Sequence, residues 1–245
     1  MKIIIELHNV YSEICSELPS EALEEISNSC SYLQKTFNSN FGTESFSQIS
    51  IFNLNSKTFP TGLHARVIKK LKQLGYGIAI KDLRDKPKTD LDRLLNRASE
   101  FGLALRDYQI EGIIAGLETN CGLFNWCTGS GKTVIFSFLL MAYDKPSLIL
   151  VNRKELMEQI SKELSYMTGN SVGQIGDGIW QPSKWTVGIV NTLNRGLNSD
   201  SESVKIKTRR FLEGIDVFIG DEIHHLGART WKEIAKTTKN ASVRF

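Results

Sequence analysis

The chain has 245 residues, of which 41% are hydrophobic and 23% are charged, a composition typical of a globular protein with room for two domains. No apolar run approaches the roughly 18–20 residues that a membrane span requires, and the N-terminus MKIIIELHNV has too short an apolar core for a secretory signal. The four cysteines form no C-x-x-C pair, so we expect reduced thiols, a cytoplasmic location and neither a disulfide nor a zinc site.

Charge is distributed unevenly along the chain, although the net charge is only +3. Residues 1–60 carry three Lys against seven Glu, whereas residues 61–110 carry eleven Lys and Arg against six Asp and Glu. A basic segment of this kind is compatible with a nearby phosphate backbone, but a solvated helix face has the same composition. The charge pattern therefore leaves both interpretations open.

The first third of the chain mixes short strands and helices. Ser20 and Glu24 are typical of a helix start, and Gly75 is typical of a helix end. The pattern predicts strands at Lys2–Leu7, Val10–Cys15, Phe46–Leu54 and Tyr76–Ile80, helices at Ala22–Leu33 and Leu63–Leu74, and a loop at Phe37–Gly42. We expect a small α+β domain over residues 1–82, then a charged linker and a short amphipathic helix (90–101) over residues 83–102.

From Leu103 onward the predicted helices and strands alternate, which is the pattern of a parallel sheet covered by helices on both faces. The expected strands lie at 121–126, 147–151, 172–175, 186–190 and 215–220, and the expected helices at 107–118, 132–143, 153–167, about 191–197, about 205–212 and about 229–237. We therefore predict an α/β domain over residues 103–245 that binds its ligands at the carboxyl ends of the strands.

A glycine-rich segment, Cys127–Thr133 (CTGSGKT), separates the expected strand at 121–126 from the expected helix at 132–143. This is the context of a phosphate-binding loop, in which backbone N–H groups and the helix N-terminus surround a phosphate. Lys132 can reach the β- and γ-phosphates, and the Thr133 hydroxyl can bind Mg²⁺. Trp126 stands where the strict pattern has Gly, so a simple turn before a buried helix is the structural alternative. The residues expected to bind the nucleotide here are Thr128, Gly129, Ser130, Gly131, Lys132 and Thr133.

A second motif follows the apolar run Ile215–Gly220, which is typical of a strand buried on both faces. It consists of Asp221 and Glu222, and a carboxylate at the end of such a strand is what a Walker B site needs. Asp221 would hold Mg²⁺, and Glu222 would orient and deprotonate the attacking water. Because strands often end in polar residues, this pair indicates a nucleotide site only in combination with the loop around Lys132.

In this combination the chain resembles a superfamily 2 helicase, and within that group the UvsW-type DNA helicases of tailed phages. CTGSGKT is similar to helicase motif I, in which the first Gly is often replaced, and Asp221–His224 (DEIH) is similar to the DExH form of motif II. The resemblance implies a RecA-like motor domain after a small accessory domain, with ATP and Mg²⁺ as cofactors and hydrolysis coupled to DNA unwinding or branch remodelling. It also implies that His224 couples the nucleotide site to the DNA cleft, where the alternative is a loop His bonded to backbone.

The segment Leu105–Gln109 (LRDYQ) resembles the L-R-x-Y-Q sequence that opens the motor domain in this family. The resemblance assigns adenine recognition to Gln109, with Arg106 and Tyr108 beside the nucleotide pocket. An amide offers one donor and one acceptor side, which suits the edge of adenine. A solvated Gln at the start of an amphipathic helix is the alternative.

Two further segments resemble DNA-contacting motifs. Ser147–Gln159 is similar to motif Ia, so Arg153 is a candidate for a DNA-backbone contact, with an ordinary solvated residue at a helix start as the alternative. Thr186–Leu193 is similar to a later DNA-contacting strand and loop, which makes Asn191 and Thr192 candidates.

The resemblance also implies a second motor domain, which would supply an arginine finger and the far wall of the ATP cleft. We expect that domain to follow motif III, beyond Phe245, so that this chain represents the N-terminal half of the enzyme, in the host cytoplasm if it is phage-encoded. Two alternatives remain open from sequence: the motor lobe of a restriction-type translocase or RNA helicase, and a non-catalytic, nucleotide-gated DNA-binding module.

Overall fold

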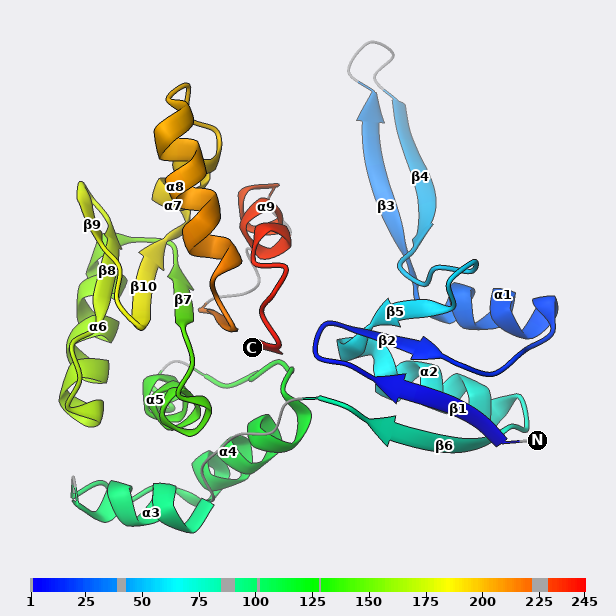
Figure 1. Ribbon diagram of the computed structural model, residues 1–245, viewed down its shortest axis with the longest axis horizontal. Coiled ribbons are helices and arrows are strands. Elements are labelled where there is room, and N and C mark those ends of the chain that lie inside the picture. Colours follow the sequence, from blue (N-terminus) through cyan, green and yellow to red (C-terminus); the bar gives the residue numbers. More distant parts are fainter. Residues whose placement is uncertain (1, 39–42, 85–90, 101, 128, 222–228) are drawn as a thin grey trace. The chain divides into compact units, whose positions relative to one another are not determined.

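The computed structural model describes residues 2–38, 43–84, 91–100, 102–127, 129–221 and 229–245. The chain divides into two compact units, Met1–Asp85 and Lys86–Phe245, which are described separately (Figure 1). No helix among the described residues is long and apolar enough to span a membrane.

The first unit is built on a four-stranded sheet in the order β5-β2-β1-β6. The central strand β1 alternates buried Ile3, Ile5 and Leu7 with outward residues, because successive side chains of a strand point to opposite faces. Its buried face packs against Ile26 of one helix and Val67 of another. The elements of this core are β1 (Lys2–Leu7), β2 (Tyr11–Ile14), α1 (Ser20–Ser29), β5 (Thr58–Pro60), the 3₁₀ helix η1 (Thr61–Leu63), α2 (His64–Gln73) and β6 (Gly77–Asp82).

A two-stranded hairpin, β3 (Ser31–Asn38) with β4 (Thr43–Ser50), stands away from this sheet (Figure 1). The prediction of a helix running to Leu33 is therefore wrong. The predicted loop Phe37–Gly42 is wrong at residues 37 and 38, which belong to β3, and its residues 39–42 lie outside the described residues. The helix ends at Ser29 because the Ser29 hydroxyl donates to the Ile26 carbonyl at 2.6 Å and the Ser31 hydroxyl donates to the Asn28 carbonyl at 2.7 Å. These bonds occupy carbonyl groups of the last turn, so the chain can turn into a strand.

The second unit contains a six-stranded sheet in the order β12-β11-β7-β10-β8-β9, parallel except for the antiparallel β8–β9 pair. Its strands are β7 (Ser147–Val151), β8 (Gly173–Gly176), β9 (Ile179–Gln181), β10 (Trp185–Ile189), β11 (Val217–Gly220) and β12 (Val243–Arg244). Its helices are α3 (Leu91–Glu100), α4 (Asp107–Thr119), α5 (Lys132–Tyr143), α6 (Lys154–Thr168), α7 (Val190–Leu197), α8 (Glu202–Glu213) and α9 (Arg229–Thr237).

Alternate residues of the central strand β7 enter two different hydrophobic cores. Ile149 and Val151 pack with α5 and α6 on one face, whereas Leu148 and Leu150 pack with α7 and α9 on the other. Every residue of β7 is buried for this reason, which explains the apolar run that follows Ser147. The prediction of an α/β fold with a parallel sheet covered on both faces is confirmed.

The predicted strand at 121–126 is wrong. Only Cys121 forms a bridge, to Arg244 of β12, and residues 122–127 form no strand. The rings of Phe124 and Trp126 pack against each other at a centroid distance of 5.4 Å, and Phe124 also meets Phe136 of α5. The apolar residues of this segment therefore serve ring packing instead of strand pairing.

The unpredicted β8–β9 hairpin turns at Asp177 and Gly178, which have φ angles of 49° and 81°. Asp-Gly with two positive φ angles is a favoured two-residue hairpin turn. This dipeptide was the signal in the sequence that could have predicted the extra strand.

Candidate nucleotide-binding site

The glycine-rich segment lies at the N-terminus of α5, where Gly131 occupies the capping position. Gly129 and Gly131 have φ angles of 81° and 82°, a conformation that other residues adopt only at a cost. The hydroxyl oxygen of Ser130, between them, is buried and has no hydrogen-bond partner among the described residues. A buried polar atom without a partner is unusual, and a bound phosphate would supply one. The glycine backbone, the orphaned hydroxyl and the helix N-terminus are the features that a phosphate group fits.

Gln109 attaches this loop to helix α4. Its side chain is only 6% exposed, its Nε2 donates to the Ser130 carbonyl at 3.0 Å, and its Oε1 accepts the Arg106 amide at 3.0 Å. Gly131 is required for this contact, because a Cβ at that position would lie 2.4 Å from Gln109 Nε2. Both sides of the Gln109 amide are thus engaged with the protein, which leaves one N–H and one lone pair for the base edge of a nucleotide.

Tyr108 and Arg106 extend the same attachment. The Tyr108 hydroxyl donates to the Ser130 carbonyl at 2.9 Å and accepts a bond from Arg106 NH1, also at 2.9 Å. Arg106 caps the start of α4 in an extended conformation and remains exposed. The three residues expected beside the nucleotide are therefore connected to one another and to the loop by hydrogen bonds.

Trp126 is the residue whose role sequence reasoning missed. Its ring lies edge-on to Tyr108 at a centroid distance of 5.4 Å, and its carbonyl oxygen is 3.4 Å from Lys132 Nζ. A Cβ at Gly112 would lie 2.4 Å from the ring, so only glycine at that position of α4 admits it. The pair Gly112 and Gly116, one helical turn apart in α4, was the available sequence signal for such a close approach.

Lys132 and Thr133 form the first turn of α5, and both are partly buried. The only hydrogen bond described for the Lys132 side chain is the long one to the Trp126 carbonyl, which leaves the amino group with donors to spare. The Thr133 carbonyl accepts the Ser137 hydroxyl at 2.8 Å, which fixes this turn of the helix.

Asp221 follows β11 directly, and its amide donates to the Leu150 carbonyl of β7 at 3.0 Å. Strand β12 lies between β11 and the segment before the loop, since it pairs with β11 on one side and with Cys121 on the other. The Cys121 bridge and the β11–β12 pair are both parallel, so the chain leaves Cys121 and β11 toward the same edge of the sheet. Helix α5 also contacts β11.

The candidate DNA contacts follow the neighbouring strands at this edge. Arg153 is exposed and precedes α6, two residues beyond the end of β7. Asn191 is exposed and Thr192 is partly buried, and both lie in the first turn of α7, which starts directly after β10. The helix predicted at about 191–197 is confirmed, as Val190–Leu197. Thr128, Glu222 and His224 lie outside the described residues.

A separate group of potential metal ligands, Glu6, His8 and Glu13, lies in the first unit. Glu6 accepts a bond from Lys81 Nζ at 2.8 Å, and this bond, more than the nearby positive charge, lowers the pKa of the Glu6 carboxyl. Because Lys81 already compensates the carboxylate charge, this group is poorly suited to a divalent cation.

The family model described as type III restriction enzyme, res subunit, matches residues 102–244. The chain belongs to this family. A curated relative, the putative DNA 3'-5' helicase Rad25 of Haloarcula marismortui, is 28% identical over 165 residues, which are 66% of this chain and 24% of that protein. The chain thus spans about a quarter of the length of this relative.

Solved helicase structures share the fold. The crystal structure of the UvsW helicase from bacteriophage T4 is 18% identical in sequence and has a TM-score of 0.70. The matched region covers 100% of this chain and 91% of the UvsW chain. A second crystal structure of T4 UvsW, also 18% identical, covers 100% of this chain and 52% of its own with a TM-score of 0.72. A hypothetical ATP-dependent RNA helicase from Sulfolobus tokodaii is 16% identical, covers 63% of this chain and 49% of its own, and has a TM-score of 0.51. The predicted likeness to UvsW is confirmed at the level of the fold, and so is the RecA-like α/β fold that it implies.

Proposed function

We propose that this chain is the accessory and first motor portion of an ATP-dependent DNA helicase that unwinds DNA or remodels branched intermediates. The observation that carries this proposal is the match to UvsW over 100% of the chain, because it includes the first unit as well as the motor domain. The family match alone covers only residues 102–244 and would fit any motor of this family. The name of the Rad25 relative, a DNA helicase, also supports DNA over RNA.

In this proposal ATP binds at the N-terminus of α5. The loop residues Gly129 to Gly131 would surround the phosphates, with the Ser130 hydroxyl as one donor and Lys132 as the charged partner. Thr133 and Asp221 would hold Mg²⁺, which neutralises phosphate charge when it is bound. Gln109 would read the base with the bonding capacity that its protein contacts leave unused.

Glu222 would activate water and His224 would transmit the state of the nucleotide to the DNA cleft, as the resemblance to motif II implies. Arg153, Asn191 and Thr192 would contact the DNA backbone. Arg153 follows β7, the strand next to the Asp221 strand β11, and the other two follow β10, the next strand along in the sheet. A second motor domain would complete the ATP cleft. An arginine finger of the kind it would provide raises hydrolysis rates in other nucleotidases by on the order of 10³–10⁵. Action on DNA would place the protein in the cytoplasm, and in the host cytoplasm if it is phage-encoded.

Two measurements on the intact protein test this proposal. The first is titration with a fluorescent ATP analogue, in which Lys132→Ala should lose at least ten-fold in affinity while Lys162→Ala, an exposed lysine of α6, remains unchanged. The second is ATP hydrolysis with forked duplex DNA or with RNA added. Greater stimulation by forked DNA, lost in Lys132→Ala, supports the helicase. Stimulation by RNA alone, or full nucleotide affinity in Lys132→Ala, contradicts it.

A further inference from the structure

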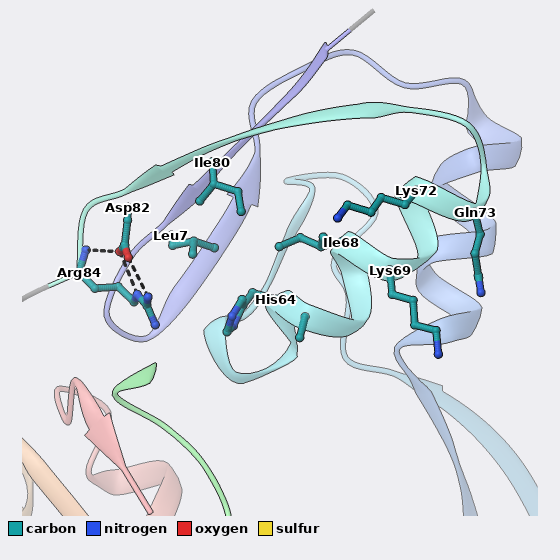
Figure 2. Close-up of a pocket in the computed structure, with 10 residues that line it drawn as sticks. Leu7, His64, Ile68, Lys69, Lys72, Gln73, Ile80, Asp82 and Arg84 are labelled. Carbon is teal, nitrogen blue, oxygen red and sulfur yellow. Dashed lines mark hydrogen bonds and ion pairs between the residues drawn. The ribbon is translucent and has the colours of Figure 1, made fainter. Parts of the chain in front are cut away.

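A groove of about 760 Å³ lies within the first unit, between helix α2 and strand β6 (Figure 2). Leu7 and Ile80 contribute apolar side chains from the sheet, and Ile68 and Ala65 contribute them from the helix. Its borders are polar, with Lys69 and Lys72 on α2 among the lining residues. An apolar floor with a polar border is typical of a binding groove.

The groove exists because α2 contacts β6 but leaves the Ile80 end of that outer strand uncovered. The register pairs Ile5 of β1 with Ile80 of β6, so the two side chains lie next to each other on the same face of the sheet. Ile5 is fully buried, whereas Ile80 is 52% exposed. The apolar row of the core therefore continues past the helix into open space.

Strand β6 is also an edge of its sheet, since β1 is its only partner in the described sheet order. The Leu83 amide donates to the Leu7 carbonyl at 2.8 Å, so odd-numbered residues of this strand direct their backbone groups toward β1. The N–H and C=O groups of Ile78, Ile80 and Asp82 consequently point outward, along the groove side of the edge. An edge of this kind is a template for one more strand.

Charge over the groove is positive. Lys69 and Lys72 are exposed, and neither has an ion pair among the described residues, whereas Lys70 beside them pairs with Glu25. The acidic group in the lining, Asp82, is compensated by Arg84, whose Nε lies 2.9 Å from one carboxylate oxygen and whose NH2 lies 2.7 Å from the other (Figure 2). A ligand with negative charge therefore gains the most from this site.

We propose that this groove docks an extended, acidic segment of a partner protein, which adds to β6 as a further strand. Its backbone would bond to the outward groups of Ile78 and Ile80, alternate apolar side chains would enter the groove, and its carboxylates would meet Lys69 and Lys72. A nucleic acid fits less well, because phosphates would gain nothing from the apolar floor or from the backbone edge. A second copy of this chain fits less well too, because a two-fold pairing of β6 edges would bring equivalent lysines together.

The experiment selects binders to the intact protein from a phage-displayed library of random nine-residue peptides. The expected result is enrichment of sequences that alternate apolar and acidic residues. A synthetic peptide of the enriched sequence should lose at least ten-fold in affinity, measured by fluorescence anisotropy, in two variants. Ala65→Trp fills the groove from an exposed helix position, and Lys69→Glu/Lys72→Glu reverses the charge of its border. The double variant should instead bind a peptide whose acidic residues are replaced by lysine.

Lys2→Glu is the matched control, because Lys2 is exposed on β1 and points away from the face that α2 covers. It should bind the acidic peptide like the unaltered protein, and all variants should keep the melting temperature and the nucleotide affinity. Absence of such enrichment, or binding that Ala65→Trp leaves unchanged, overturns the proposal. Loss of forked-DNA binding in the double variant without peptide selection would identify a nucleic-acid surface. Dimers that Ala65→Trp dissociates would identify a second copy of this chain as the occupant of the groove. Either of these two results also overturns the proposal.

Discussion

The substitution Gly131→Ala tests how the phosphate loop is attached to α4. Two costs arise at this position. Alanine at a φ of 82° is strained by about 1–2 kcal/mol. Its Cβ would also lie 2.4 Å from Gln109 Nε2, so the Gln109 side chain must move and lose its bond to the Ser130 carbonyl.

The lost hydrogen bond contributes about 0.5–1.5 kcal/mol, and the buried donor left without a partner adds about 1 kcal/mol or more. The total is roughly 2.5–4.5 kcal/mol, which corresponds to about a 70- to 2,000-fold loss in nucleotide affinity if only the attached loop binds. Gly129→Ala is the matched control, because Gly129 has nearly the same φ, 81°, but no atom within 4 Å of an added Cβ. It should show the backbone cost alone.

The assay is a titration with a fluorescent ADP analogue, combined with thermal unfolding, for Gly131→Ala, Gly129→Ala and Gln109→Ala. The double variant Gly131→Ala/Gln109→Ala removes the side chain that the new methyl group would strike. In that background Gly131→Ala should cost no more than Gly129→Ala does in the unaltered protein. Equal effects of the two glycine substitutions, or strict additivity of the double variant, would refute the attachment of the loop through Gln109.

Three further predictions concern single groups. Ser130→Ala removes a buried hydroxyl that has no partner among the described residues, so the melting temperature should not fall. The affinity for ATP should drop roughly 10- to 100-fold, because a hydrogen bond to a charged group is lost. A lower melting temperature with unchanged affinity contradicts this prediction. Asp221→Asn should abolish the Mg²⁺ dependence of ATP affinity but spare metal-free ADP binding, and isothermal titration with and without EDTA distinguishes the two. The pKa of the Cys15 thiol is raised, first by burial and then by the charges of Glu6 and Glu13. At pH 8 this thiol therefore holds less thiolate and should react with iodoacetamide more slowly than free cysteine does. Glu13→Gln should speed the reaction, and an unchanged rate across pH 7–9 would contradict the prediction.

The sequence was sufficient for the elements whose burial is complete. Strand β7 and helix α5 have the predicted bounds, 147–151 and 132–143, because their nearly continuous apolar sequences require a buried environment. Helix α9 was likewise placed correctly at 229–237. In these segments local pattern and tertiary burial demand the same structure.

The sequence was insufficient where apolar residues pack outside the sheet or are exposed. The run at 122–126 satisfies the pattern of a buried strand, yet its rings pack on α4 and α5 and not between strands. The β3–β4 hairpin exposes Leu33 and Phe46 by 71% and 64%, so neither strand shows a buried face in its pattern. Such a ribbon carries little hydrophobic periodicity to detect.

The candidate site was predictable in its local parts and not in its connections. CTGSGKT was evident from the sequence, but the bonds that join Gln109 and Tyr108 to Ser130 span more than twenty residues. In the sequence, Trp126 was only a departure from the motif. In the structure, its carbonyl group contacts Lys132 and its ring packs on α4, so that it links the two. Long-range contacts of this kind depend on the packing of α4 against α5, which no local pattern specifies.

The account depends most on Thr133 and Asp221 sharing one metal ion at the carboxyl edge of the sheet. Substitution of Fe²⁺ for Mg²⁺ in the presence of ATP tests this directly, because ascorbate and peroxide then cleave the backbone next to the metal. We predict two ATP-dependent cuts in the same molecules, one near Thr133 and one near Asp221, identified by mass spectrometry and lost when EDTA is added. Cleavage near only one of the two residues would show that they do not share a metal, and would contradict the proposed nucleotide site.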